Sequence, residues 1–91
     1  MSIEILILTA PGCTTCNQAK AVVQKVVEQI GQEIPGLSYR PVDVADSPEI
    51  GMRYGILSTP AIVINDKLAF RGAPKEKALK KALETMKREI A

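Results

Sequence analysis

Histidine and tryptophan are both absent from this chain of 91 residues. Without histidine, the chain by itself can form neither a Ser-His-Asp nor a Cys-His catalytic arrangement, and it offers no imidazole to a metal ion. This absence argues against hydrolases and the common zinc enzymes. Cysteine is scarce as well, with two residues, which excludes a secreted scaffold held together by many disulfides. Few chemistries remain open to the chain.

Aromatic residues and net charge are also low. Tyr39, Tyr54 and Phe70 are the only aromatic residues, they are far apart, and the net charge is +2. Because nucleic-acid-binding proteins combine basic patches with stacking aromatic side chains, we expect no nucleic-acid partner. The apolar run from Ile5 to Leu8 is far shorter than the ~20 residues that span a bilayer and lacks the basic start of a signal peptide. We therefore expect a cytoplasmic protein that binds no membrane.

The length predicts one domain over residues 1–91, because it lies below the usual domain size of about 100–150 residues. The first half predicts a strand, a helix and a strand. Residues 3–8 are apolar and end at a Pro-Gly breaker, and residues 37–44 alternate in part, with Pro41 typical of an edge strand. Between them, apolar residues at helical spacing precede Gly31, which can end a helix: Ala19, Val22, Val23, Val26, Val27 and Ile30.

The second half predicts a short helix, a hairpin and a final helix. Ser47 reads as the N-cap of a helix that ends at Gly55, and residues 61–71 read as a hairpin around a turn at residues 65–67. The final helix follows residues 72–74 and has an apolar stripe: Leu79, Ala82, Leu83, Met86 and Ile90. The order β-α-β-α-β-β-α predicts an α/β fold with a four-stranded mixed sheet and helices on both faces.

The two cysteines form the motif Cys13-Thr14-Thr15-Cys16, where the first predicted strand gives way to the first helix. Free N–H groups and the helix dipole stabilise an anion there, so the pKa of the Cys13 thiol is expected below its free value of ~8.5. Cys13 is the predicted nucleophile. Cys16 follows about one helical turn later, so its sulfur can resolve a mixed disulfide on Cys13. We expect no bound cofactor, only a redox-active Cys13–Cys16 disulfide, with Thr14 and Thr15 hydroxyls available to a thiolate.

Two other uses of these sulfurs stay open. One is a metal or persulfide carrier, which would need a dimer to supply four cysteines because a tetrahedral zinc or iron–sulfur site takes four N or S ligands. The other is a pair of inert buried thiols. A C-x-x-C motif near a β-α-β pattern in a cytoplasmic protein favours redox chemistry over both. We therefore expect a monomer without a metal site.

The Thr59-Pro60 step comes directly before the predicted hairpin. A cis bond there would turn the Thr59 backbone toward the cysteine motif, where it could pair with an extended substrate. Because cis bonds are only ~5–6% of X-Pro bonds in folded proteins, the residues alone favour a trans proline that opens an edge strand.

Two motifs together resemble the thioredoxin superfamily: residues 11–16, PGCTTC, and residues 54–60, YGILSTP. The second is similar to the region around the cis-proline of thioredoxins. Gly72-Ala73 resembles the loop that completes their substrate surface. The similarity covers nearly the whole chain and extends in particular to the small archaeal thioredoxins, also called glutaredoxin-like, which lack the first β-α unit of longer thioredoxins.

The resemblance implies a thioredoxin-like fold and a protein disulfide oxidoreductase in which Cys13 attacks, Cys16 resolves and a cis Pro60 faces them. It also implies which residues tune the active loop, namely Pro11, Gly12, Thr14 and Thr15. The groove that holds the substrate backbone would be lined by Thr59, Pro60, Gly72 and Ala73. The implied partners are protein disulfides and, as electron donor, a thioredoxin-reductase-type flavoenzyme.

Several positions depart from the family pattern. Longer thioredoxins have tryptophan where this chain has Gly12, and a buried aspartate and its lysine partner where it has Ile7 and Pro41. The usual proton acceptor for the resolving thiol is therefore missing, and the sequence leaves water, Asp43 and Asp46 as candidates. The dipeptide between the cysteines is neither Gly-Pro nor Pro-Tyr, the pairs common in thioredoxins and glutaredoxins.

The residues after the last predicted strand bear on whether glutathione is used. Glutaredoxins commonly follow the last strand with Gly-Gly and an acidic residue that contacts glutathione, whereas residues 72–75 here are GAPK. This favours protein disulfides as substrates and leaves a glutathione-linked glutaredoxin as an alternative. A further reading is an interaction domain that binds an acidic partner through the lysine-rich last helix, although a solvated face explains those lysines more simply.

Overall fold

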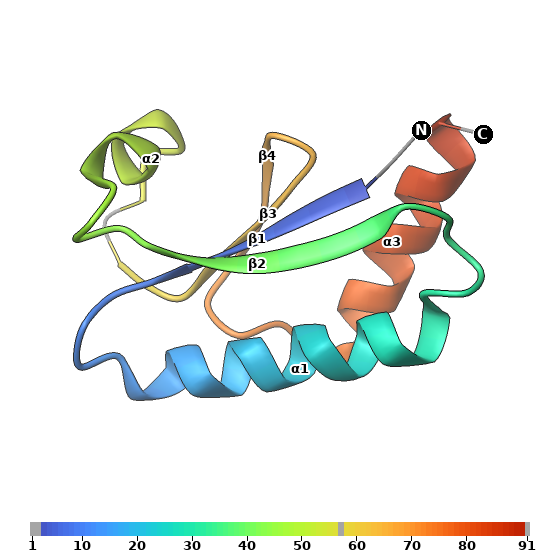
Figure 1. Ribbon diagram of the computed structural model, residues 1–91, viewed down its shortest axis with the longest axis horizontal. Helices are drawn as coiled ribbons and strands as arrows, with labels where there is room; N and C mark the ends of the chain where they lie inside the picture. Colours follow the sequence, from blue (N-terminus) through green and yellow to red (C-terminus); the bar gives the residue numbers. More distant parts are fainter. Residues whose placement is uncertain (1–2, 57, 91) are drawn as a thin grey trace.

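The computed structural model describes residues 3–56 and 58–90. Leu57 of the YGILSTP motif and the side chain of Ile90 lie outside the described part. The elements follow the predicted order (Figure 1): β1 (Ile3–Thr9), α1 (Thr14–Ile30), β2 (Leu37–Asp43), α2 (Pro48–Arg53), β3 (Ala61–Ile64), β4 (Lys67–Arg71) and α3 (Glu76–Ile90).

The four strands form one mixed sheet in the order β2-β1-β3-β4. β1 pairs in parallel with β2 and antiparallel with β3, and β3 pairs antiparallel with β4. The mixed four-stranded sheet is therefore confirmed. β2 lies at an edge of the sheet, where Pro41, opposite Ile7, costs no hydrogen bond to an outer neighbour.

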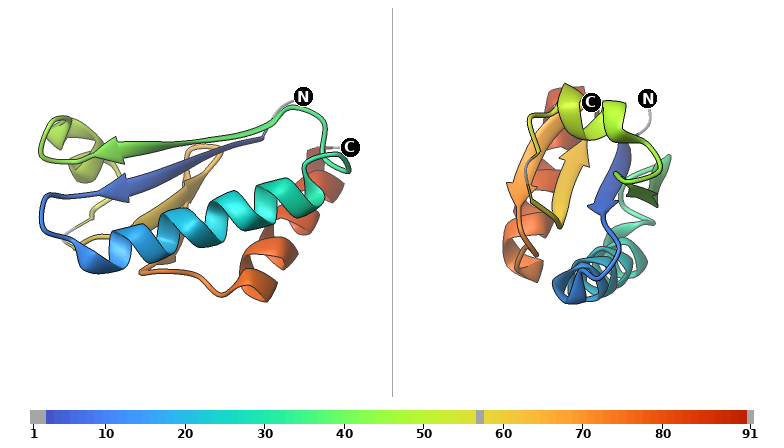
Figure 2. Two further views of the ribbon diagram at one scale, coloured as in Figure 1. Left: turned by 60° about the horizontal axis from the view of Figure 1, so that its bottom comes forward. Right: turned by 90° about the vertical axis from the view of Figure 1, so that its left-hand side faces the viewer.

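Helices cover both faces of the sheet, with α1 and α2 on opposite sides in the right-hand view of Figure 2. Side chains alternate between the faces of a strand, and β1 is buried on both faces except at Glu4. Ile3, Ile5 and Ile7 pack in a first core with residues of α1 and α3. Leu6 and Leu8 pack in a second core on the α2 side.

α1 buries the face that its apolar spacing predicts, including Ala19, Val23 and Val26. Because β-branched valines have weak helix propensity, this packing accounts for much of the helix's stability. Gly31 ends α1 in a right-handed conformation with φ −60°, and its N–H donates to the Val27 carbonyl oxygen at 2.8 Å. A Cβ on Gly31 would lie 2.5 Å from that oxygen, so close approach rather than a left-handed turn requires glycine.

The end of α2 differs from the prediction. Ser47 occupies the N-cap position without a side-chain capping hydrogen bond, and the helix ends at Arg53 rather than at Gly55. The Tyr54 N–H still donates to the Ile50 carbonyl oxygen at 3.3 Å. Gly55 then reverses the chain with φ +64°, a conformation that glycine adopts without steric cost.

The hairpin turn is shorter than predicted. Asn65 and Asp66 alone form the loop, with φ values of 47° and 71°, and Lys67 belongs to β4. Two residues with positive φ match the twist of the flanking strands. Asp66 also accepts hydrogen bonds from the Tyr54 hydroxyl at 2.5 Å and from Arg53 at 2.7 Å, which joins α2 to the hairpin.

α3 packs against the first core through Leu79 and Leu83, both 0% exposed. Ala82 and Met86 pack beside them, which confirms the apolar stripe for the side chains described. The last helix also forms an exposed ion pair with α1, between Glu76 and Lys25 at 3.0 Å. Within residues 3–56 and 58–90, no helix is long and apolar enough to cross a membrane.

Candidate active site

Cys13 and Cys16 are joined by a disulfide, with their Cα atoms 5.4 Å apart. Cys13 is the N-cap residue of α1, in extended conformation with φ −83° and ψ 102°. Its backbone N–H donates to the Ala10 carbonyl oxygen at 3.2 Å, closing the loop between β1 and α1. Gly12, with φ +76°, makes this turn possible. The disulfide thus lies where the sequence predicts, at the positive end of the α1 dipole.

The two sulfurs differ in accessibility. Cys16, in the first turn of α1, is 3% exposed, whereas Cys13 is only partly buried. The Thr15 hydroxyl oxygen lies 3.7 Å from the Cys13 sulfur, within the range of a weak sulfur hydrogen bond. An incoming molecule therefore meets Cys13 before Cys16.

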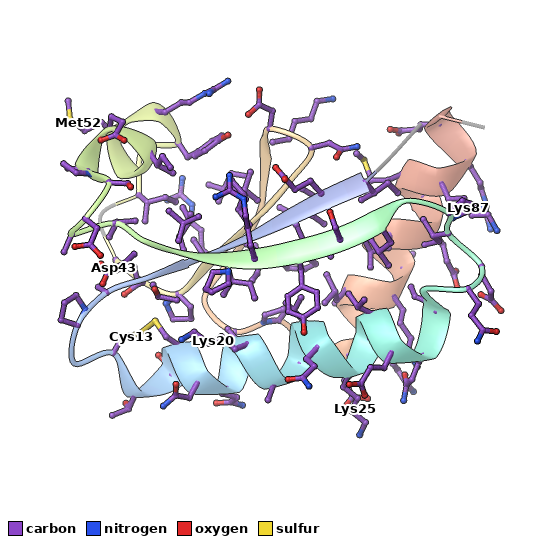
Figure 3. All side chains as sticks on the ribbon, in the orientation of Figure 1. Cys13, Lys20, Lys25, Asp43, Met52 and Lys87 are labelled. Carbon is purple, nitrogen blue, oxygen red and sulfur yellow. A yellow bond between two sulfur atoms is a disulfide. The ribbon has the colours of Figure 1, made fainter. Side chains whose placement is uncertain are left out.

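A cavity of about 420 Å³ opens beside the disulfide. It lies between the loop after β1, the first turns of α1 and the end of β2, and Figure 3 shows Cys13, Lys20 and Asp43 together at this end of the molecule. Its lining consists of Thr9, Ala10, Pro11, Gly12, Cys13, Thr14, Cys16, Asn17, Lys20 and Asp43. Three of the four predicted loop residues line it; Thr15 instead contacts the Cys13 sulfur.

Lys20 is a charged residue of this cavity that the sequence motifs do not single out. It follows Cys16 by four residues on α1, and residues at this spacing lie on the same side of a helix. That spacing could have identified it. Asp43, one of the carboxylates considered for the proton of Cys16, lines the cavity, whereas Asp46 does not.

The predicted substrate-binding residues form a second group. The Thr59–Pro60 peptide bond is cis, and the Gly72 N–H donates to the Pro60 carbonyl oxygen at 2.7 Å. Ala73 packs against the first core. The structure therefore brings the Pro60 and Gly72 segments together, and none of the four residues lines the cavity at the disulfide.

Ile7 and Pro41, where longer thioredoxins have the buried aspartate and its lysine partner, have structural roles here. Ile7 is 0% exposed in the first core, and Pro41 is exposed on the edge strand. Neither position supplies a charged group near the disulfide. Among the described residues, no group of three or more His, Cys, Asp or Glu side chains is placed to hold a metal ion.

An α/β fold of this order with a disulfide at the start of the first helix defines a thioredoxin-like oxidoreductase. The sequence profile described as a thioredoxin domain matches residues 1–84, and the chain belongs to this family. It is 36% identical over 83 residues to the thioredoxin of Methanocaldococcus jannaschii, covering 90% of this chain and 93% of that one. It is 33% identical over 81 residues to a probable thioredoxin of Archaeoglobus fulgidus, covering 89% of this chain and 86% of that one.

Solved structures show the same fold. A protein disulfide oxidoreductase from Aeropyrum pernix superposes with a TM-score of 0.78 at 22% identity, covering 97% of this chain. This chain spans only 38% of that longer protein. A mutant thioredoxin from Halobacterium salinarum superposes with a TM-score of 0.74 at 22% identity, covering 92% of this chain and 74% of that one. At these identities the likeness supports the fold alone.

Proposed function

We propose that this chain, as one domain over residues 1–91, reduces disulfide bonds of protein substrates by dithiol–disulfide exchange. The observation that carries the proposal is the unequal exposure of the two bonded cysteines at the start of α1, with Cys13 accessible and Cys16 3% exposed. In the reduced protein, Cys13 is the nucleophile, because α1 stabilises its thiolate. Cys16 is the resolving thiol.

The exchange has two steps. The Cys13 thiolate attacks one sulfur of the substrate disulfide, forms a mixed disulfide and releases the other substrate sulfur as a thiolate. Cys16 then attacks the Cys13 sulfur, which forms the Cys13–Cys16 disulfide and releases the second substrate thiol. The substrate gains two electrons and the cysteine pair loses two. The disulfide in the structure corresponds to the oxidised end of this cycle.

The proposed substrate groove is formed by the segments that meet at the Pro60–Gly72 hydrogen bond. Thr59 and Pro60 precede β3, and Gly72 and Ala73 follow β4. Backbone groups there would pair with an extended segment of substrate, as an added strand does. Pro11, Gly12 and Thr14, in the cavity wall beside Cys13, would shape the approach of the substrate disulfide.

A Cys16→Ser variant tests the assignment of roles. Mixed with a small disulfide-containing protein, it should accumulate a mixed disulfide through Cys13 that mass spectrometry identifies, because the resolving thiol is gone. The matched Cys13→Ser variant should accumulate far less, since Cys16 is buried. Equal modification of both variants, or modification of neither, would contradict the proposal.

The electron donor that we propose is a thioredoxin-reductase-type flavoenzyme, in the cytoplasm, acting on the monomeric protein. Purified flavoenzyme should reduce the Cys13–Cys16 disulfide catalytically. Glutathione alone should reduce it slowly, because residues 72–75 lack the Gly-Gly and acidic pattern of glutaredoxins. Faster reduction by glutathione than by the flavoenzyme would favour a glutaredoxin instead.

A further inference from the structure

The cavity beside the disulfide has one carboxylate and one ammonium group, from Asp43 and Lys20. Apart from the two cysteines, no other titratable group lines it within the described residues. Building on the dithiol exchange proposed above, we propose that Asp43 accepts the proton of the Cys16 thiol during resolution, and that Lys20 stabilises the negative charge shared between sulfur and carboxylate.

Strand register places the Asp43 side chain on the same face of the sheet as the cysteines. In the parallel β1–β2 pair, Val42 lies opposite Leu8 and Asp43 opposite Thr9. Val42 and Leu8 belong to the second core, on the α2 side. Because neighbouring side chains of a strand point to opposite faces, Asp43 points to the α1 side, where the helix begins with the disulfide.

The Asp43 carboxylate is held in place and keeps one oxygen available. Its Oδ1 atom accepts a hydrogen bond from the Ala45 N–H at 2.8 Å. Its backbone carbonyl oxygen accepts bonds from Asp46 N–H at 3.1 Å and Ser47 N–H at 3.0 Å. In the described part of the chain, Oδ2 has no hydrogen-bond or ion-pair partner. A carboxylate oxygen of this kind can accept a proton.

Asp46 does not have these properties. It lies in the turn after β2, is exposed, and does not line the cavity. The sequence left Asp43 and Asp46 equivalent as acceptors, and the structure separates them. Asp46 therefore serves as the matched control for Asp43.

Lys20 and Lys25 both lie on α1, but Lys20 lines the cavity and Lys25 does not. Lys25 forms an ion pair with Glu76 at 3.0 Å, away from the cysteines. Lys20 lines the cavity and, within residues 3–56 and 58–90, forms no ion pair. Its charge is thus directed at the space where Cys16 loses its proton and where the thiolates form. An ammonium in this place favours a thiolate.

The proposed step is balanced in atoms and electrons. The proton of Cys16 moves to Asp43 Oδ2, directly or through one water, and the Cys16 sulfur forms a bond to the Cys13 sulfur. The bond between Cys13 and the substrate sulfur breaks, and the substrate leaves with the electron pair as a thiolate. Asp43 then returns its proton to solvent, and the thiolate takes one from solvent.

An Asp43→Asn variant tests the acceptor role. Asparagine keeps the oxygen that bonds to the Ala45 N–H, so the turn is preserved, but it cannot take the proton. Rapid chemical quenching after mixing reduced protein with a protein disulfide would measure how fast the Cys13 mixed disulfide disappears. At pH 7 we expect about 10²-fold slower resolution, the lower end of general base contributions, and a much smaller effect on attack by Cys13.

The pH dependence and the controls distinguish proton transfer from a structural effect. The difference in resolution rate between Asp43→Asn and the unmodified chain should shrink as pH rises, because hydroxide then deprotonates Cys16 without Asp43. Asp46→Asn should resolve like the unmodified chain, and Asp43→Glu, which keeps a carboxylate, should recover part of the rate. Lys20→Gln should slow resolution at low ionic strength and less so at high salt, whereas Lys25→Gln should not.

The results that would overturn the inference are distinct from those that would overturn the function. If Cys16→Ser traps the mixed disulfide but Asp43→Asn resolves at the unmodified rate at every pH, the function stands and the acceptor role of Asp43 is wrong. Equal slowing by Asp43→Asn and Asp46→Asn would also overturn it. If Cys16→Ser traps nothing, both proposals fail together.

Discussion

The backbone N–H of Gly72 donates a hydrogen bond to the Pro60 carbonyl oxygen at 2.7 Å. This bond lies next to the Ala61–Arg71 pair at the end of the β3–β4 ladder, and it joins the two segments that we propose bind substrate. Gly72 makes the bond with φ +92°, a conformation in which other residues are strained. The shape of the proposed groove therefore depends on a glycine at this position.

A Gly72→Ala substitution should weaken substrate binding more than it weakens attack by Cys13. No atom lies within 4 Å of the Cβ position, so the penalty arises from backbone conformation and should be about 1–2 kcal/mol. Since about 1.4 kcal/mol corresponds to tenfold, we expect KM for a protein disulfide to rise by about fivefold to thirtyfold. Reduction of a small aromatic disulfide, which needs no groove, should keep its rate.

Gly55→Ala is the matched control for this prediction. Gly55 also has a positive φ, +64°, and open space at its Cβ position, but it follows α2 and lines a separate hollow with Met52 and Ile56. Both variants should lose comparable stability in urea unfolding. An equal rise in KM for the two variants would mean that general destabilisation, not the groove, causes the effect.

The hydroxyl of Thr15 should help to stabilise the Cys13 thiolate, because its oxygen lies 3.7 Å from the Cys13 sulfur. Thr15→Val removes this donor and keeps the shape of the side chain. We expect the pH midpoint of Cys13 alkylation in the reduced protein to move upward by a few tenths of a unit, since weak hydrogen bonds contribute only about 0.5–1 kcal/mol. Thr14→Val should leave the midpoint in place, and an equal shift in both variants would remove the special role of Thr15.

Ile7 should tolerate a smaller apolar residue but not the aspartate that longer thioredoxins have at the matching position. The side chain is 0% exposed and packs with residues of α1 and α3. Ile7→Val should cost about 0.5–1.5 kcal/mol of unfolding free energy. Ile7→Asp should cost several kcal/mol, because burial of a carboxylate without a partner is strongly unfavourable. Urea unfolding at pH 7 would show whether the two costs are instead similar.

Local patterns in the sequence were sufficient for the element order, the sheet and the position of the cysteines. The apolar spacing of Ala19, Val23 and Val26 identified the buried face of α1, because helical periodicity is a local property. The exact ends of helices and strands were harder to predict from the sequence. Whether Lys67 belongs to the turn or to β4 depends on hairpin register, and composition alone does not determine register.

The site was predictable where it depends on neighbouring residues and not where it depends on register. Cys13 and Cys16 are close because one turn of helix separates them. The choice between Asp43 and Asp46 depends on which β2 residue lies opposite Thr9, and that is a property of the assembled sheet. Lys20 has the right spacing from Cys16, but its significance depends on a cavity that three separate segments form.

Tyr54 should make stability more sensitive to alkaline pH. The hydrogen bond that its hydroxyl donates to Asp66 raises the pKa of Tyr54 above its ordinary value of 10.0, and burial adds to the increase. A raised pKa in the folded state means that the stabilisation is complete below the unfolded value and is lost as pH rises through the folded value. The hydrogen bond therefore contributes fully at neutral pH and disappears above pH 10.

Tyr54→Phe tests this linkage. At pH 7 the variant should lose at most about 1 kcal/mol of unfolding free energy, the usual net contribution of one hydrogen bond, since Asp66 is largely exposed. Between pH 10 and pH 12 the difference in unfolding free energy between the variant and the unmodified chain should close. Tyr39→Phe, which changes an exposed tyrosine on β2, should show no such convergence. A gap that stays constant as pH rises would mean that Tyr54 stabilises the α2–hairpin contact through packing of its ring alone.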